Sequence, residues 1–258
     1  MRVLPLVVLL LIVLAGGGCA PEMYAPEPYN VPLHSEKGEL QMRGNYHWTD
    51  DPEYAPSSTG FDYNVSGSVS ATPLPHVIVQ GGGAVARLDG VIQKENVPTH
   101  SLSYWEVGAG TYFDLRDPLM AEVLAGWGQG SVSGTGSDLD AYYRVEGELS
   151  RRFLQFDVGV SRLSLEDVAP VLDAGLGLRL SDVELSHLHS DERDVPAQTG
   201  ALFLEPILVA RLQHYGAGIE ASMAYSRELR SLTTPYDHIG MKFGIGVSIH
   251  PHRFFNDS

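Results

Sequence analysis

Apolar and polar residues alternate along most of the chain beyond residue 39, with a period of two rather than 3.6. The last stretch, from Ile239 to His250, is the clearest, because every second position there is apolar. Such alternation predicts β-strands whose two faces meet different surroundings. No helical pattern of similar length competes with it. Ten strands are expected, near residues 39–48, 61–72, 76–88, 103–113, 119–131, 153–162, 172–185, 203–212, 218–226 and 239–250.

The connections between these strands alternate in length. Short connections are expected at residues 72–75, 114–118, 164–170 and 213–217. Long ones are expected at residues 49–60, 89–100, 132–152, 186–200 and 228–238. Short periplasmic turns that alternate with long extracellular loops are typical of outer-membrane β-barrels.

Strand length and face polarity favour a membrane barrel over a soluble sandwich. The expected strands have about ten residues, which is the length needed to cross a bilayer at a tilt. Isolated charges lie among glycines and serines on the polar faces, and aromatic residues gather near strand ends. The sequence therefore predicts an all-β fold, a closed antiparallel up-and-down transmembrane β-barrel of about ten strands. Eight or twelve strands are alternatives, because residues 141–149 can extend strand five or six, and a lipid-tethered sandwich is the other fold considered.

Composition narrows the possible functions. The formal net charge is −15, so the surface repels nucleic acid, and no basic run offsets this repulsion. Nucleic-acid binding is therefore not expected. The chain has no phosphate-binding glycine motif, since Gly81 to Gly83 lie within an expected strand, where they suggest a bulge. No cofactor is expected.

The amino-terminal residues predict export and lipidation. Residues 4–14 form an apolar run that is too short to span a membrane as a mature helix. Small residues then precede Cys19, the single cysteine, and this arrangement resembles a bacterial lipobox. The resemblance implies that residues 1–18 are removed as a signal peptide and that Cys19 carries acyl chains such as palmitate. Two or three acyl chains hold a protein stably on membrane lipid. An ordinary signal peptide with a chance cysteine is the alternative.

The chain divides into three parts under this interpretation. After the signal peptide, residues 19–38 contain four prolines and few aliphatic residues, which predicts an extended tether. Residues 39–258 form the barrel. An even number of strands places both termini on the periplasmic side, where lipidated Cys19 is expected.

Two short stretches resemble known outer-membrane proteins. The last expected strand resembles the C-terminal signal recognised by the barrel assembly machinery, through Lys242, Gly244, Val247 and Ile249. Residues 251–258 follow it, so the signal is slightly internal. Residues 30–39 resemble the lead-in of a group of small, mostly uncharacterised outer-membrane β-barrel lipoproteins of the Gram-negative envelope. The resemblance implies a fold, a location and the assembly machinery as a partner during biogenesis, and it brings no catalytic residues.

Charged residues on the polar strand faces are expected to point into the lumen. Both signs occur, which predicts a salt-bridge network that plugs a barrel only slightly wider than the filled eight-stranded kind. A narrow, charge-lined pore for solute uptake is the alternative. The lumen-facing candidates are Arg43, Glu106, Glu122, Asp157, Asp173, Arg179, Glu220 and Lys242.

The densest polar cluster lies in the fourth long loop. His187 and His189 alternate there and are weak candidates for a metal site. Together with Asp191 and His238 they are also candidates for a surface hydrolase or protease. A solvated loop is the simpler interpretation, because the spacings match no recognised motif. The sequence thus favours a non-enzymatic structural, accessory or partner-binding role, with a possible outer-membrane protein partner, over a pore or a hydrolase.

Overall fold

The computed structural model describes residues 22–24, 31, 33–34, 37–49, 63–92, 95–138, 141–164, 171–190, 194–214, 216–230, 237–238 and 240–251. Most of these residues lie in β-strands. The predicted signal peptide, residues 1–18, and Cys19 lie outside the described residues. Within the described part of the chain, no helix is long and apolar enough to span a membrane.

Ten antiparallel strands form the wall of a barrel, which confirms the predicted fold and strand number. Three short elements accompany them. The strand β11 (Arg227–Arg230) follows β10 and pairs with β9, whereas β1 (Glu22–Tyr24) and β12 (Asp237–His238) form a separate parallel pair. The wall strands are β2 (Leu40–Thr49), β3 (Tyr63–Leu74), β4 (Val77–Ile92), β5 (Glu95–Arg116), β6 (Leu119–Asp138), β7 (Ala141–Ser164), β8 (Val171–His189), β9 (Gln198–His214), β10 (Ala217–Tyr225) and β13 (Met241–Ile249).

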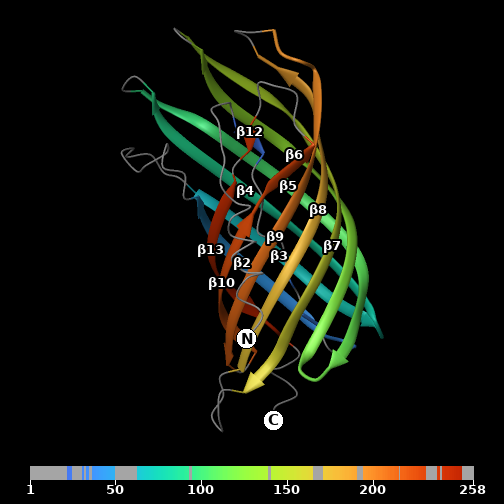
Figure 1. The fold of residues 1–258 in the computed structure, drawn as a ribbon. Coiled ribbons are helices and arrows are strands. Elements are labelled where there is room, and N and C mark those ends of the chain that lie inside the picture. Colours follow the sequence, from blue (N-terminus) through green and yellow to red (C-terminus); the bar gives the residue numbers. More distant parts are fainter. Residues whose placement is uncertain are drawn as a thin grey trace, which may run out of the picture.

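The last strand closes the barrel. From β2 to β10, each wall strand pairs with its neighbour in the sequence, and β13 pairs with both β10 and β2 (Figure 1). In this closing register, Ile245 lies opposite Tyr46 on one side and Ala221 on the other. Closure leaves no long open edge, which matters in lipid because unpaired backbone groups cannot be hydrated there.

Several strands run further than the alternation predicts. The expected long loop at residues 132–152 is largely strand, since β6 continues to Asp138 and β7 begins at Ala141. Residues 141–149 thus extend the sixth wall strand, one of the two options left by the sequence. The loops expected at residues 89–100 and 186–200 are shortened in the same way. The bulge suggested at Gly81 to Gly83 is wrong, because these residues keep regular register with both neighbouring strands.

The outer wall of the barrel is apolar. A water-soluble protein rarely exposes so much contiguous apolar surface, whereas the hydrocarbon core of a bilayer favours it. The soluble sandwich is therefore excluded by both the closure and this surface. Outward-facing side chains that are 39–65% exposed include Met42, Tyr46, Val65, Val69, Val107, Leu154, Phe156, Val158, Leu176, Leu178, Leu208, Leu212, Ile219, Ile245, Val247 and Ile249.

Both faces of the wall change character towards the loop end. On the outer faces of β7 and β8, the apolar run ends at Leu154 and Leu180, and the next outward residues are Arg152 and Asp182. Those two charged residues are opposite each other in the register. Beyond this level the outward residues are polar and the inner face becomes apolar. The barrel therefore has a membrane-spanning part and an extramembrane part, which we call the loop-end extension (β5–β8 beyond the Arg152–Asp182 level).

Aromatic side chains mark the two edges of the apolar band. Trp127 lies opposite Arg152 in the register and makes an edge-to-face contact with Trp105. Phe113 is 46% exposed and lies on β5 eight residues after Trp105, towards the turn end. At about 3.3 Å per residue and a tilt of about 40°, those residues rise by roughly 20 Å along the barrel axis. This height fits the thin apolar band of outer-membrane barrels, which is about 25 Å tall.

Candidate functional site

The lumen is filled with buried charged side chains. Among the described residues, five cationic and seven acidic side chains are at most 8% exposed. Charges inside a protein need partners, because an unpaired buried ion is costly. They are Arg43, Arg151, Arg179, Arg211 and Lys242, with Glu39, Glu106, Glu122, Asp157, Asp173, Glu205 and Glu220.

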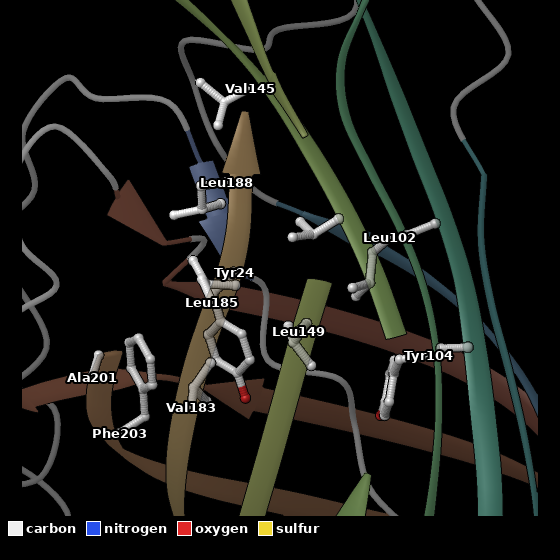
Figure 2. Close-up of a cluster of buried hydrophobic side chains, with 13 residues drawn as sticks. Tyr24, Leu102, Tyr104, Val145, Leu149, Val183, Leu185, Leu188, Ala201 and Phe203 are labelled. Carbon is white, nitrogen blue, oxygen red and sulfur yellow. The ribbon is translucent and has the colours of Figure 1, made fainter. Parts of the chain in front are cut away.

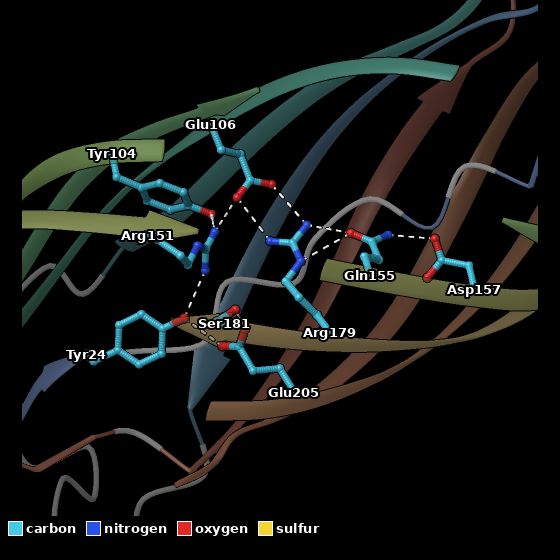
Figure 3. A network of polar contacts seen from close by, with 9 residues as sticks. All are labelled: Tyr24, Tyr104, Glu106, Arg151, Gln155, Asp157, Arg179, Ser181 and Glu205. Atoms are coloured by element: carbon cyan, nitrogen blue, oxygen red, sulfur yellow. Dashed lines mark hydrogen bonds and ion pairs between the residues drawn. The ribbon is translucent and has the colours of Figure 1, made fainter. Parts of the chain in front are cut away.

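A network centred on Glu106 crosses the middle of the lumen (Figure 3). Glu106 on β5 accepts hydrogen bonds from Arg179 on β8, at 3.0 and 3.1 Å, and from Arg151 on β7. Arg179 also donates to Gln155 at 2.7 Å, and Gln155 donates to Asp157 at 2.6 Å. The network thus links β5 to β7 and β8 across the inside of the barrel and occupies this section of the lumen.

An aromatic side chain holds one of these arginines in place. The Arg179 guanidinium stacks over the Phe153 ring, 4.1 Å from its centroid. Phe153 in turn lies over two inward glycines, Gly108 and Gly126. A Cβ at Gly126 would collide with the Phe153 ring, so only glycine leaves room for the ring at this position.

A second group of charges lies nearer the turn end. Glu220 on β10 accepts hydrogen bonds from Arg43 on β2 and Arg211 on β9. Close by in the chain, Gln213 donates to Asp173 and also contacts the His250 Nε2 at 3.1 Å. These residues come from strands β2, β8, β9 and β10, so they tie the closing seam together from inside.

The chain before β2 lies inside the barrel. The backbone oxygen of Val31 accepts a hydrogen bond from Arg211, and the His34 amide donates to the Glu122 carboxylate at 2.5 Å. The His34 ring contacts Glu39 at 3.1 Å and Ser70 at 3.0 Å. The expected extended tether at residues 19–38 thus has described residues that are buried against the lumen wall.

Leu33 fills a space made by two glycines. Gly159 on β7 and Gly175 on β8 lie opposite each other in the register and both face inwards. A Cβ at Gly175 would lie 3.1 Å from a Leu33 methyl group and 3.0 Å from Val31. Leu33 is 3% exposed and has a positive φ of 55°. The wall is therefore shaped to receive this segment.

Higher in the lumen, Tyr24 links the segment to the central network. Its ring stacks on Phe203 with centroids 4.5 Å apart. Its hydroxyl donates to Glu205 at 2.7 Å and accepts from Arg151 at 2.9 Å. Arg151 also donates to the Tyr104 hydroxyl at 2.9 Å. A side chain outside the wall therefore completes the polar network.

Tyr24 also belongs to an apolar cluster on the inner face of the loop-end extension and of the adjoining parts of β4 and β9 (Figure 2). Side chains from β4 to β9 converge there with little exposure. This is the reverse of the membrane part, where the inner face is polar, and it resembles the core of a water-soluble protein. The cluster comprises Tyr24, Ala84, Ala86, Leu102, Tyr104, Val132, Val145, Leu149, Val183, Leu185, Leu188, Ala201 and Phe203.

The structure places all eight lumen-facing candidates inside the wall. Seven of them have contacts described above, and Lys242 is 1% exposed. Sequence reasoning missed several partners. Arg151 was missed because strand six was expected to begin at residue 153. Glu205 and Arg211 lie on the inward face of β9, within an expected strand, so their alternation with the outward-facing Leu204, Leu208 and Leu212 was a usable signal.

The other predicted residues lie elsewhere. His187 and His189 are exposed at the loop end, and His187 contacts Glu148 at 3.1 Å. A positive φ of 52° at His187 and a register shift turn Leu188 inwards. Asp191 is outside the described residues, and nothing is described of the His238 side chain. Among the described residues, no three His, Cys, Asp or Glu side chains are grouped to hold a metal.

The predicted assembly signal occupies the closing strand. Lys242 and Gly244 point inwards and are buried, whereas Val247 and Ile249 face outwards and are 58% and 42% exposed. This strand joins β10 to β2, so its pairing completes the barrel.

Comparison with solved structures finds bacterial outer-membrane barrels. The translocator domain of the autotransporter NalP from Neisseria meningitidis is 12% identical and has a TM-score of 0.48, covering 84% of this chain and 89% of its own. The outer membrane protease OmpT from Escherichia coli is 9% identical, with a TM-score of 0.44 and coverages of 83% and 94%. The β domain of the Bordetella autotransporter BrkA is 12% identical, with a TM-score of 0.42 and coverages of 83% and 99%.

These resemblances are of general architecture, so no role is carried from those proteins to this chain. No protein-family model matches the sequence, and no curated protein sequence matches it.

Proposed function

We propose that this chain is a lipid-anchored, non-conducting outer-membrane barrel with a structural or accessory role, whose loop-end extension binds a partner protein. The observation that carries the proposal is the occupied lumen. Paired charges cross it in the middle, and Val31, Leu33 and His34 fill it near the turn end. A pore needs a continuous water-filled path, whereas these side chains contact one another directly.

The apolar outer wall and its aromatic edges support a membrane location. Strands that stop near the apolar band at the turn end and continue past it at the loop end fit an orientation with the loop end outside the cell. Acylation of Cys19 after removal of residues 1–18, and recognition of β13 by the barrel assembly machinery, belong to the same proposal. Sequence motifs support both.

The loop-end extension supports a binding role because it extends the barrel beyond the membrane. Its outward side chains on β7 are polar, including Arg144, Glu146 and Glu148. The extension is built as paired strands over an apolar cluster, so it presents a fixed surface rather than loose loops. The exposed His187 and His189 lie on this same surface. A hydrolase has less support, because the described residues assemble no catalytic group there.

Conductance measurements test the closed lumen. The purified protein in planar bilayers should give no stable channels, because the central network and the residues Val31, Leu33 and His34 each occupy a section of the lumen. Stable channels from the unaltered protein would overturn the closed-barrel proposal and favour the pore.

Co-purification in mild detergent tests partner binding. We expect a stoichiometric companion from native outer membranes. A matched variant replaces residues 136–143 by Asn-Gly, a two-residue turn that suits the paired strands β6 and β7. It should lose the companion while the barrel still folds. A companion that stays bound equally well to this variant would place the contact elsewhere, and purification of the protein alone would argue against a partner.

A further inference from the structure

The short strand β1 lies at the loop end of the barrel (Figure 1). It pairs in parallel with β12, with Glu22 opposite Asp237 and Tyr24 opposite His238. In the sequence, β12 lies between β11 and β13, at the end of the barrel where β13 begins with Met241. The chain at Glu22 is therefore at the opposite end from the turn where β2 starts.

Contacts of the described residues follow the lumen from one end to the other. His34 contacts Glu122, three residues from the turn-end start of β6. Leu33 packs between Gly159 and Gly175, and Tyr24 reaches Glu205 and Phe203 in the upper part of β9. The contacts of Val31, Leu33 and His34 therefore lie near the turn end, whereas those of Tyr24 lie further towards the loop end.

We propose that the amino-terminal segment passes through the lumen, so that Cys19 emerges at the loop end and its acyl chains enter the outer leaflet of the membrane. This inference rests on the proposed lipidation and membrane location. It replaces the expectation that both termini lie on the periplasmic side. The barrel would then serve as the conduit for its own lipid anchor. Two features would attach the protein to the membrane, namely the membrane-spanning wall and the acyl chains in the outer leaflet.

Chain length decides between the two leaflets. Two residues lie between Cys19 and Glu22, and the three Cα-to-Cα steps span at most about 11 Å when the chain is fully extended. From Met241 to Ile249, β13 has nine residues, which rise by about 26 Å along the strand. An anchor tied to Glu22 therefore cannot reach the periplasmic leaflet at the turn end.

The outer leaflet is close to the same point. Among the described residues, the loop-end rim is lowest at Met241 of β13 and Thr49 of β2, whereas β5 to β8 extend further (Figure 1). Trp48 and Phe243 stack at this low rim, with centroids 6.2 Å apart, and mark the membrane interface. Four residues lie between His238 and Phe243, so β12 and its partner β1 lie just above the interface.

An epitope tag tests where the segment emerges. The tag is inserted between Pro21 and Glu22 of the full-length protein and detected by antibody on intact and on permeabilised cells. We expect equal signals, because the insertion lies outside the membrane. The same tag after Ser258 is the control, and it should be detected only after permeabilisation. A tag at Pro21 that needs permeabilisation would overturn the inference.

A disulfide provides a second test that needs no insertion. The Glu22→Cys/Asp237→Cys pair joins register partners, and these cysteines should cross-link in cells as the barrel folds. The control pair, Lys37→Cys/Asp237→Cys, starts from an exposed residue at the turn end and should stay reduced. Failure of the first pair to form, or equal cross-linking of both pairs, would overturn the inference.

Failure of the inference and failure of the proposed function give different results. The mass of the amino-terminal peptide reports acylation, and a gel shift on boiling reports a closed barrel. An acylated, heat-modifiable protein whose tag faces the periplasm overturns the inference alone. A protein that lacks acyl chains or the gel shift overturns the proposed function instead.

Discussion

At the scale of single residues, the lumen is specified by small side chains as much as by charged ones. Gly175 leaves the space that Leu33 and Val31 occupy, with a would-be Cβ 3.1 and 3.0 Å from them. Glycine within a strand usually weakens it. Its inward position here therefore indicates a site where another part of the chain approaches the wall closely.

A double-mutant cycle tests the Leu33 site. Gly175→Val should destabilise the barrel by about 1–3 kcal/mol through overpacking, and Leu33→Ala by about 2–5 kcal/mol through a cavity. The double variant should lose less than the sum, because the introduced valine side chain occupies part of the cavity. Denaturant unfolding in lipid vesicles measures each value. Gly81→Val, which faces outwards, is the control and should have little effect. Strictly additive losses would mean that Leu33 does not fill this space.

The Glu106 carboxylate is the shared ion-pair partner of two buried arginines, Arg151 and Arg179. Glu106→Gln leaves Arg151 and Arg179 without this charge, and breaking a buried pair costs about 3–5 kcal/mol. The midpoint temperature of the gel shift on boiling should therefore fall clearly. Glu146→Gln is the matched control, because Glu146 is 61% exposed beside Arg144, and exposed pairs contribute about 0–1 kcal/mol. Equal effects of the two substitutions would show that the central network is not a stabilising feature.

At the scale of strands, the alternation of residues was enough to place the membrane-spanning part. Each expected strand overlaps a wall strand, because lipid on one side and a polar lumen on the other impose the same pattern throughout. The extension was predicted only as an option at residues 141–149, for the same reason. Val145, Gly147 and Leu149 alternate with Glu146 and Glu148, but here the apolar side faces inwards. A search for apolar outward faces interprets that stretch as a loop.

The amino-terminal segment was harder to predict. It contains four prolines and few aliphatic residues between positions 20 and 37, which is the composition of a linker. Its contacts are with residues far away in the sequence, such as Glu122, Arg211 and Glu205. Local patterns carry no information about such pairings. The paired inward glycines on β7 and β8 were the one available sign.

The membrane boundary on β8 gives a prediction at this scale. Leu178 faces outwards in the membrane part and is 41% exposed, whereas Glu184 lies on the same side of the strand beyond Asp182. Leu178→Arg should make folding into vesicles less favourable by about 2–4 kcal/mol. Glu184→Arg should change it little, because the new charge stays in water. Equal losses at both positions would place the boundary elsewhere.

At the scale of the whole molecule, one continuous barrel has a part surrounded by lipid and a part surrounded by water. The strands do not break at the boundary, yet the inner and outer faces exchange their polarity there. Below it, buried ion pairs and the amino-terminal segment fill the lumen, and lipid covers the apolar wall. Above it, an apolar cluster fills the interior and water covers the polar wall. The two parts therefore depend on different interactions, although they share the same hydrogen-bonded ladders.

This division predicts that the extension can be loosened without unfolding the membrane part. Phe203 is fully buried in the apolar cluster and stacks on Tyr24, so Phe203→Ala should cost about 3–5 kcal/mol. Hydrogen exchange in nanodiscs should then quicken at residues 145–149 and 183–188 and stay unchanged at residues 154–160 and 174–180, since stability is local where cooperative units differ. Phe156→Ala makes the same chemical change on the lipid-facing wall and should leave the extension protected. Faster exchange throughout the Phe203→Ala barrel would show instead that the extension and the membrane part open as a single unit. In that case the hydrogen-bonded ladders that the two parts share, rather than their different side-chain interactions, would determine which residues open together.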